Sequence, residues 1–307
     1  MAAKGMDRVS ISVGDLKESL AFYRDWIGME VVAEEVLPPR EVQALWNLPQ
    51  GTEAVSVLLR NEPQPTLLEL IEFRPHTGTV MRTDPKALDY GLYGLSVLVR
   101  DLDSLYRQLT ARGYRFTTKP VRYKPPFVAY EVVTAALIGP DHNPIYHFER
   151  LVGGSAGGQG SYVELNHVAE IVPNVERARK FYGGILGLRF RGEFVNPGGM
   201  DEMFDLAPGD QTMEFFYDTE PEKCLVVNLV WSSKRGRSLG GVARPPNAGE
   251  FMTSFPVDDL EGMMDHLKAG GFNLLSGPLT VHDKRHGERR AITVEGPADD
   301  VVELFEV

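Results

Sequence analysis

The chain has 307 residues, of which 43% are hydrophobic and 24% are charged, as in ordinary globular proteins. This length is sufficient for two domains of about 150 residues each. The formal net charge of −11 argues against nucleic acid or an anionic membrane surface as a partner, because nothing offsets the repulsion from phosphate groups. The single cysteine, Cys224, excludes an intrachain disulfide and a cysteine-based metal site.

A first structural module is predicted from residues 8–31, which read "RVSISVGDLKESLAFYRDWIGMEV". Its apolar residues first alternate, as in a half-buried strand, and Asp15-Leu16 then turns the chain. Apolar residues three and four apart follow, which predicts a helix that stops at Gly28. The apolar stretches "VSVLLR" and "TLLELIEF" (residues 66–73) predict further strands.

A second module has the same order of elements. Residues 95–116, "LSVLVRDLDSLYRQLTARGYRF", predict a strand, an Asp-Leu turn and a helix that ends at Gly113. The module closes with "GPDHNPIYHFE" at residues 139–149. Residues 151–161, "LVGGSAGGQGS", have the Gly/Ser-rich composition of a flexible linker.

The second half of the chain repeats the first. Residues 167–190 repeat residues 8–31 without a gap, and residues 253–274 repeat residues 95–116. The ending "GPADDVVELFE" repeats "GPDHNPIYHFE", and "QTMEFFYD" (residues 211–218) answers "TLLELIEF". We therefore predict an α+β fold of four tandem β-α-β-β-β modules, paired into two domains at residues 1–150 and 162–307.

The strand–Asp-Leu–helix–Phe-Tyr order and the Gly-Pro…Glu ending resemble the vicinal oxygen chelate superfamily. That superfamily includes glyoxalase I, bleomycin-resistance proteins and extradiol ring-cleaving dioxygenases. The resemblance covers nearly all of the chain outside the linker. It implies that paired modules close into U-shaped half-barrels with a site on the concave face. Two such domains in one chain look most like the extradiol dioxygenases.

In the first half, the alternation of side chains along a strand directs Arg8, Glu69, Gly94 and Tyr146 toward the concave face. The resemblance implies metal ligands at these four positions, usually His or Gln, then Glu or another polar residue, then His and finally Glu. The observed set does not hold a divalent ion, and the charge of Arg8 opposes one. We expect an Arg8–Glu69 ion pair and a metal-free scaffold, and the alternative is a role for these residues in binding an anionic ligand.

The matching positions of the second half are His167, Glu214, Met252 and Glu303. Imidazole and carboxylates suit Fe²⁺, Mn²⁺, Zn²⁺ or Ni²⁺, so His167, Glu214 and Glu303 are the candidate metal ligands, with structural hydrogen bonding as the alternative. Met252 stands where the resemblance implies a second histidine, and its thioether is a poor ligand for hard ions, which favours a place in the pocket lining. Glu170 is a second departure, because a carboxylate stands where the first repeat has Ile11, on the face directed toward the helix.

The resemblance to ring-cleaving dioxygenases also implies groups that move protons. His282 and His286 in "VHDKRHGE" lie about the right distance before Glu303 to act as acid–base residues. The alternative is that both are exposed loop histidines without a functional role. The tyrosine that those enzymes have before the last ligand is absent near Thr293. With the second histidine ligand absent too, ordinary catechol cleavage is not favoured.

Several functions remain open from the sequence. The chain fits a metal-dependent enzyme, either a dioxygenase with an altered ligand set or a glyoxalase-like lyase or isomerase. It also fits a metal-free protein that sequesters a small molecule as bleomycin-resistance proteins do, in a concavity lined by Phe216, Phe305 and Tyr146. A third option is metal-free catalysis with Glu214 or Glu303 as the base.

The expected partners follow from the same observations. We expect a small aromatic or oxygen-rich substrate, no nucleic acid or membrane, and a homodimer as one possible assembly. The sequence shows no signal peptide at its start, and none of its apolar runs approaches the roughly 18 residues of a membrane-spanning helix. This predicts a soluble cytoplasmic protein.

Overall fold

The computed structural model describes residues 2–62, 64–126, 129–151, 161–196, 201–218 and 224–307. Apart from its two end residues, the predicted linker at 151–161 lies outside the described residues. Within the described part of the chain, no helix is long and apolar enough to span a membrane.

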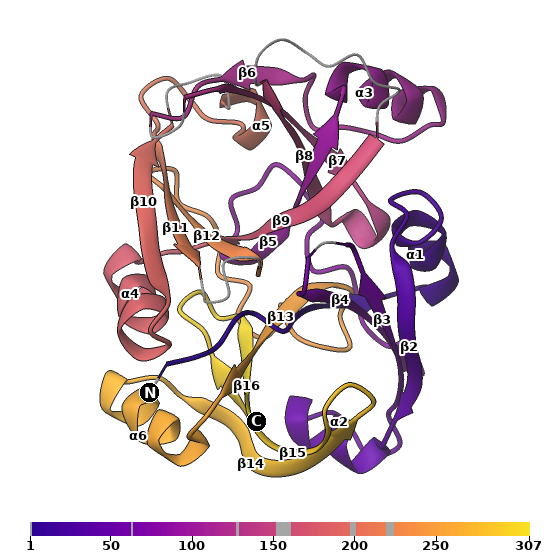
Figure 1. Cartoon of the computed structure of the whole chain (residues 1–307), viewed down its shortest axis with the longest axis vertical. Helices are drawn as coiled ribbons and strands as arrows, with labels where there is room; N and C mark the ends of the chain where they lie inside the picture. The colour runs from indigo at the N-terminus through magenta and orange to yellow at the C-terminus, as the bar shows by residue number, and fades with distance from the viewer. Residues whose placement is uncertain (1, 63, 127–128, 152–160, 197–200, 219–223) are drawn as a thin grey trace.

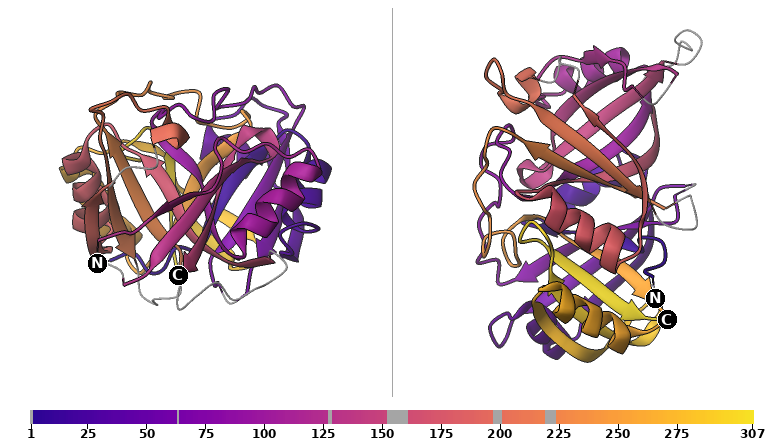
Figure 2. Two further views of the ribbon diagram at one scale, coloured as in Figure 1. Left: turned by 90° about the horizontal axis from the view of Figure 1, so that it is seen from above. Right: turned by 90° about the vertical axis from the view of Figure 1, so that its left-hand side faces the viewer.

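Two curled eight-stranded sheets form half-barrels stacked along the long axis of the molecule (Figures 1 and 2). The first half-barrel has the strand order β14-β15-β16-β13-β1-β4-β3-β2. Its strands are β1 (Arg8–Val13), β2 (Glu30–Leu37), β3 (Glu53–Arg60), β4 (Leu67–Arg74), β13 (Gly249–Val257), β14 (Leu274–Asp283), β15 (Gly287–Glu295) and β16 (Val301–Glu306). The second half-barrel has the order β10-β11-β12-β9-β5-β8-β7-β6. Its strands are β5 (Gly91–Arg100), β6 (Val121–Tyr123), β7 (Glu131–Ile138), β8 (Pro144–Leu151), β9 (Ser161–Ile171), β10 (Arg189–Val195), β11 (Thr212–Asp218) and β12 (Val226–Ser232).

Each half-barrel joins modules from opposite halves of the chain. Strand β1 of the first module pairs antiparallel with β13 of the fourth, and β5 of the second module pairs antiparallel with β9 of the third. The prediction of four modules in two half-barrels is confirmed, but the assignment of one half-barrel to residues 1–150 and the other to 162–307 is wrong. Duplication makes the exposed edges of the modules similar, so local sequence patterns do not determine which edges pair. Each of the two ranges contributes one module to each half-barrel.

The repeated turn before each long helix is a helix cap. The Asp15 side chain accepts a hydrogen bond of 2.9 Å from the backbone N–H of Glu18, and Asp101 accepts one of 3.1 Å from Ser104. Asn174 and Asp259 cap the corresponding helices of the third and fourth modules. The helices are α1 (Leu16–Tyr23), α2 (Pro39–Trp46), α3 (Leu102–Ala111), η1 (Pro140–His142), α4 (Val175–Arg179), the π-helix η2 (Lys180–Ile185), α5 (Asp201–Phe204) and α6 (Leu260–Gly270).

Four helices, α1, α3, η2 and α6, pack between the two half-barrels. The largest hydrophobic cluster combines apolar residues of both sheets with residues of α1, α3, η2 and α6. The ring centroids of Phe22 and Tyr114 are 5.7 Å apart, and those of Phe181 and Phe272 are 4.9 Å apart. Modules that are neighbours in sequence therefore pack through their helices, although their strands belong to different sheets.

Helix α2 fills the concave side of the first half-barrel. Val42 and Leu45 are buried in two apolar clusters with residues of the inner sheet face. The Trp46 ring lies 5.4 Å from that of Phe73, and the backbone carbonyl of Leu45 accepts a hydrogen bond of 3.1 Å from Thr293. A cavity of only about 30 Å³ remains beside the helix. That volume holds about one or two water molecules rather than a substrate.

Candidate functional site

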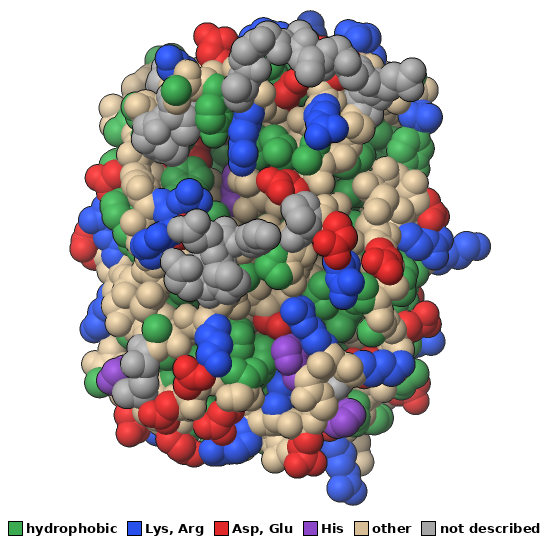
Figure 3. Space-filling view, viewed as in Figure 1, with side chains coloured by type: hydrophobic (Ala, Val, Ile, Leu, Met, Phe, Trp, Pro, Cys, Tyr) green, Lys and Arg blue, Asp and Glu red, His purple; other side chains and the backbone are tan. Residues whose placement is uncertain are grey.

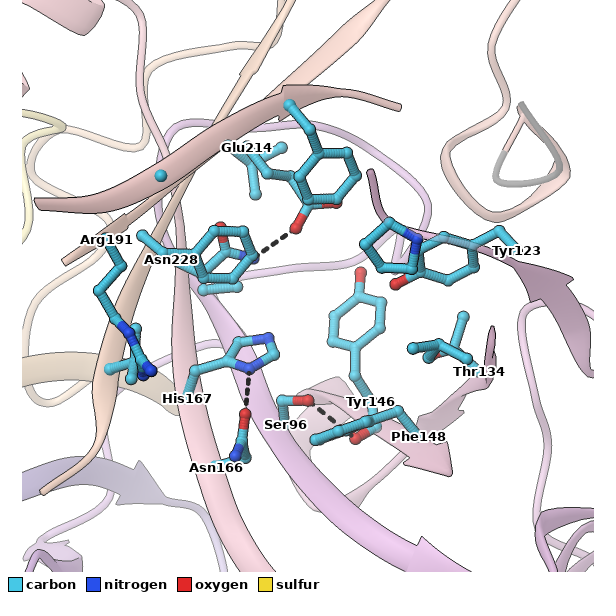
Figure 4. A pocket seen from close by; sticks show the side chains of 18 of the residues that line it. Ser96, Tyr123, Thr134, Tyr146, Phe148, Asn166, His167, Arg191, Glu214 and Asn228 are labelled. Carbon is cyan, nitrogen blue, oxygen red and sulfur yellow. Dashed lines mark hydrogen bonds between the residues drawn. The ribbon is translucent and has the colours of Figure 1, made fainter. Parts of the chain in front are cut away.

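The second half-barrel contains a cavity of about 510 Å³ on its concave side (Figure 4). Small-molecule sites commonly have volumes of about 300–1,000 Å³ and a largely apolar lining with a few polar groups. The lining here is strongly aromatic and includes Tyr93, Tyr123, Tyr130, Tyr146, Phe148, Phe194, Phe204 and Phe216. The polar groups that face one another across it include His167, Glu214 and Asn228 (Figure 4).

His167 on β9 is held as a neutral imidazole. Its Nδ1 lies 3.0 Å from the side-chain oxygen of Asn166, which can accept a hydrogen bond but cannot donate one, so Nδ1 carries the hydrogen. Burial, together with the positive charge of Arg150, lowers the pKa of His167 to about 4. At neutral pH the Nε2 atom is therefore an acceptor. Its ring lies 6.0 Å from that of Phe216, edge to face, on the cavity wall.

Glu214 on β11 is a buried carboxyl in the same cavity, and only 7% of it is exposed. Burial raises its pKa to about 7, although a hydrogen bond of 2.8 Å from the side-chain amide of Asn228 favours the ionised form. Protonated and ionised forms are therefore both populated near neutral pH. A carboxyl with this property can accept a proton from a bound molecule and return it.

Tyr146 on β8 places its hydroxyl in the cavity, on the side toward Glu214 and Tyr123 (Figure 4). Burial raises the pKa of Tyr146 well above its ordinary value, and the neighbouring Tyr93 adds to the effect. The hydroxyl therefore stays protonated and can donate a hydrogen bond. The cavity thus combines a proton-transfer group, a neutral acceptor and a hydroxyl donor.

The first half-barrel instead holds a buried network of ion pairs. Arg8 lies 3.5 Å from Glu69 and 3.0 Å from Glu303, so the predicted Arg8–Glu69 pair is confirmed. Arg289 lies 3.2 Å from the other oxygen of Glu303, and its guanidinium stacks 4.0 Å from the ring of Phe305. Burial alone would raise the pKa of Glu303, but the charges of Arg289 and Arg8 hold it below its ordinary value. Both carboxylates are neutralised by arginine, which leaves no charge for a cation.

The three predicted metal ligands do not converge on one point. His167 and Glu214 line the same cavity, whereas Glu303 lies on β16 in the first half-barrel. The prediction grouped them because they belong to the same half of the sequence. The modules exchange partners, so Glu303 faces Arg8 and not His167.

The proposed acid–base histidines lie on the β14–β15 hairpin of the first half-barrel. His286 contacts Asp7 at 2.9 Å, and the backbone N–H of His282 donates a hydrogen bond of 3.1 Å to Glu41. Neither lines the large cavity. A role for them beside His167 is therefore not supported by their position.

The predicted pocket residues are also divided between the half-barrels. Phe216 lines the large cavity, as expected. Met252 faces the small space beside α2, and Phe305 is fully buried in a cluster with Leu45 and Val281. Their strands face the concave side, but α2 covers that side in the first half-barrel.

Strand register also changes the residue that matches Glu69. Glu69 lies on β4, which pairs in parallel with β1, and the strand that pairs in parallel with β9 is β12. This register places Asn228, and not Glu214, at the position equivalent to Glu69. Glu214 lies one strand farther out, on β11, opposite Val230. Residues 211–218 were matched to residues 66–73 because β11 and β12 are both apolar, which concealed the shift by one strand.

The donor set of the second half-barrel does not fit a resident divalent ion. The four positions implied for metal ligands read His167, Asn228, Gly94 and Tyr146, and only His167 is a common ligand. A side chain does not fit at Gly94, where a Cβ atom would lie 2.2 Å from the carbonyl oxygen of Pro144. Among the described residues, no three His, Cys, Asp or Glu side chains are grouped as metal ligands.

Two residues that line the cavity, Asn228 and Arg150, were not singled out from the sequence. Asn228 interrupts the apolar stretch "CLVVNLVW", and a polar residue in a buried strand generally needs a hydrogen-bond partner. That signal pointed to a side-chain contact, although not to Glu214 as the partner. Arg150 follows Tyr146 and Phe148 at alternate positions of β8, which is the spacing of residues on one face of a strand.

The sequence model of the "Glyoxalase/Bleomycin resistance protein/Dioxygenase superfamily" matches residues 5–131 and 164–299. The chain belongs to this superfamily, and the two matched segments confirm the internal duplication. No curated protein matches the chain.

Solved structures of the superfamily share the fold of the whole chain. Glyoxalase I from Zea mays is 14% identical with a TM-score of 0.66, and the match covers 99% of this chain and 92% of the maize chain. A putative dioxygenase from Bacillus subtilis is 14% identical with a TM-score of 0.61, covering 99% of this chain and 86% of the other. At these identities the likeness establishes the four-module fold, and the activity has to be argued from the cavity.

Proposed function

We propose that the chain is an enzyme that moves a proton to and from a small aromatic substrate in the cavity of the second half-barrel, with Glu214 as the general acid–base group. The observation that carries the proposal is the buried carboxyl of Glu214 with a pKa of about 7 in a cavity of about 510 Å³. The reaction class is abstraction and return of a proton next to a carbonyl, as in an isomerase. Positioned acid–base groups of this kind typically accelerate reactions by about 10²–10⁴-fold.

The proposed chemistry uses three side chains. Ionised Glu214 takes a proton from the carbon next to the substrate carbonyl. The carbonyl group becomes an enolate, whose negative charge lies mainly on the oxygen. Tyr146, which stays protonated, donates a hydrogen bond to that oxygen. The proton then returns from Glu214 to carbon, so that all atoms and charges balance. Neutral His167 offers Nε2 to a hydroxyl or amide hydrogen of the substrate.

The aromatic lining supports an aromatic substrate. Phe194 and Phe216 are stacked at 6.0 Å on one wall, and Tyr93 and Tyr146 lie 5.7 Å apart on another. A ring bound between such walls gains about 0.5–1.5 kcal/mol per aromatic contact beyond the burial of its surface. No step is assigned to a metal ion, because the donor set does not fit one.

A second candidate is binding without catalysis, as in the sequestering type of superfamily member. The same aromatic lining favours it, since the lining alone suffices to bind a flat apolar molecule. The two candidates differ in what Glu214 does. In a sequestering protein, a bound ketone keeps its hydrogens.

The experiment uses methyl para-acetylbenzoate, an aromatic ketone with exchangeable acetyl hydrogens. Binding is followed by saturation-transfer NMR, and deuterium uptake by the acetyl group is followed by proton NMR in D₂O. We expect exchange by the wild-type protein and a loss of about 10²-fold or more in Glu214→Gln. Glu193→Gln is the matched control, because Glu193 lies on the neighbouring strand β10 and pairs with Arg179 outside the cavity. Ester that binds without exchange, or exchange that survives in Glu214→Gln, would contradict the proposal and favour sequestration.

A further inference from the structure

We infer that the molecule bound in this cavity carries an anionic group, of the carboxylate class, which Arg150 holds at the cavity wall. The inference rests on the proposed function and specifies its substrate class. It begins from the charges of the lining. Among the described residues, two arginines, Arg150 and Arg191, line the cavity together with one carboxyl, Glu214. The charge of this part of the lining is positive, whereas the net charge of the whole chain is −11.

The two arginines differ in their protein partners. Arg191 lies 3.3 Å from the carboxylate of Asp218, which also binds Arg189 at 3.0 Å. Arg150 makes no ion pair with the described residues, and its guanidinium lies 5.7 Å from the ring of Phe148. Arg150 is thus the cation of the lining whose charge the described protein leaves uncompensated.

The position of Arg150 suits recognition of one end of a substrate. Its side chain is exposed, whereas Glu214 and Tyr146 are each only 7% exposed. Arg150 is also close enough to His167 for its charge to lower the pKa of that imidazole. A space-filling view shows a hollow with a histidine surface inside it and Lys or Arg side chains at its rim (Figure 3).

These positions define an orientation for the substrate. Its anionic group lies at the mouth beside Arg150, its ring lies between the aromatic walls, and its reacting carbon lies deeper, near Glu214. An anion at the mouth stays partly hydrated and away from ionised Glu214, so little repulsion opposes proton abstraction. The planar guanidinium presents paired N–H groups that match the two oxygens of a carboxylate.

The test compares para-acetylbenzoate with its methyl ester, which has the same ring and ketone but no charge. Affinities are measured by isothermal titration calorimetry for the wild-type protein, Arg150→Met and the control Arg100→Met. Methionine keeps an unbranched apolar stem and removes the charge. Arg100 is an exposed arginine at the end of β5 outside the cavity, so its variant reports the effect of net charge alone.

We expect the wild-type protein and Arg100→Met to bind the acid about tenfold or more tightly than the ester, as a charge-assisted hydrogen bond provides. In Arg150→Met the ratio of the two affinities falls toward one. A wild-type protein that binds neither compound or prefers the ester overturns the inference, and so does a ratio that survives in Arg150→Met.

Deuterium exchange separates this inference from the proposed function. If exchange of the ester depends on Glu214 but no Arg150-dependent preference for the acid is found, the proposed proton transfer is supported and the inference of an anionic substrate is contradicted. If the preference for the acid depends on Arg150 but neither compound exchanges, the inference of an anionic substrate is supported and the proposed proton transfer is contradicted.

Discussion

The side-chain amide of Asn228 donates a hydrogen bond of 2.8 Å to the carboxylate of Glu214, across adjacent strands of the second half-barrel. Burial raises the pKa of Glu214, and this hydrogen bond opposes the rise by stabilising the ionised form. The balance between the two effects gives a pKa of about 7. Asn228 therefore holds the Glu214 carboxyl in place and lowers its pKa toward 7, so in the proposed reaction it is a positioning residue.

Replacement of Asn228 by alanine is expected to raise the pKa of Glu214 above 7, because only the effect of burial remains. Proton abstraction needs the ionised form, so its rate rises with pH through the pKa of Glu214. In Asn228→Ala this rising limb moves to higher pH by about one unit, while the rate on the plateau changes less. The pH dependence of deuterium exchange measures the shift.

Asn166→Ala is the control for that shift. Asn166 contacts His167 and not Glu214, and His167 is already neutral above about pH 4. Its removal should leave the position of the limb unchanged. If the exchange rate rises over the same pH range in Asn228→Ala and in the wild-type protein, a group other than Glu214 controls its pH dependence.

Metal dependence is a separate prediction. Because the ligand positions of the second half-barrel include Asn228, Gly94 and Tyr146, we expect less than stoichiometric Fe²⁺, Mn²⁺, Zn²⁺ or Ni²⁺ after incubation and gel filtration. Plasma mass spectrometry on untagged protein measures the content, and His167→Ala is the comparison. One metal ion per chain that is lost in His167→Ala would contradict the prediction. Exchange that is unchanged by EDTA supports it independently.

Local sequence patterns were sufficient to predict the four modules. The Asp15-Leu16 turn predicts the start of α1 because its carboxylate caps the helix, and the alternation along residues 8–13 predicts β1. The pairing of β1 with β13 was not predictable in this way. It depends on contacts between residues some 240 positions apart, such as Arg8 with Ser254.

The prediction of the site was likewise correct where it depended on local sequence patterns and wrong where it depended on long-range contacts. His167 was found because a histidine replaces Arg8 at the first position of a repeat. Glu214, which lines the same cavity, was found through an alignment that was one strand out of register. Glu303 was assigned to the same site on sequence proximity, and its ion pair with Arg8 is a long-range contact. The position of α2 on the concave side of the first half-barrel was not predicted, because the sequence of a short amphipathic helix does not indicate which sheet face the helix will cover.

The Arg8 network yields a prediction on stability. In Arg8→Met, the buried carboxylates of Glu69 and Glu303 lose a cation that lies within 3.5 Å of each. Removal of one partner from a buried ion pair typically costs about 3–5 kcal/mol of unfolding free energy, because a charge is left buried. Urea unfolding followed by circular dichroism measures the loss. Arg24→Met, which removes an exposed surface pair with Asp25, should leave the free energy of unfolding close to that of the wild-type protein.

Glu170 and Asp300 form a second buried acidic feature, where the two half-barrels meet. Both carboxyls are fully buried, and Tyr182 donates a hydrogen bond of 2.5 Å to Glu170. Burial and the charge of Asp300 raise the pKa of Glu170 well above its ordinary value, and burial raises that of Asp300 to about 6. The expectation that Glu170 points toward the helix is confirmed by its bond to Tyr182 in η2.

The folded protein consequently binds protons at these carboxyls more tightly than the unfolded chain does. Its stability should fall as pH rises from about 4 through 6, by on the order of 3 kcal/mol for Asp300 alone, because ionisation then leaves like charges buried together. Glu170→Gln removes one of these charges and keeps an oxygen that accepts the bond from Tyr182. We expect its melting temperature, relative to wild type, to be higher at pH 8 than at pH 5. Glu176→Gln, an exposed residue of α4, should show the same difference at both pH values. A Glu170→Gln effect that does not change with pH would mean that the two carboxyls do not interact.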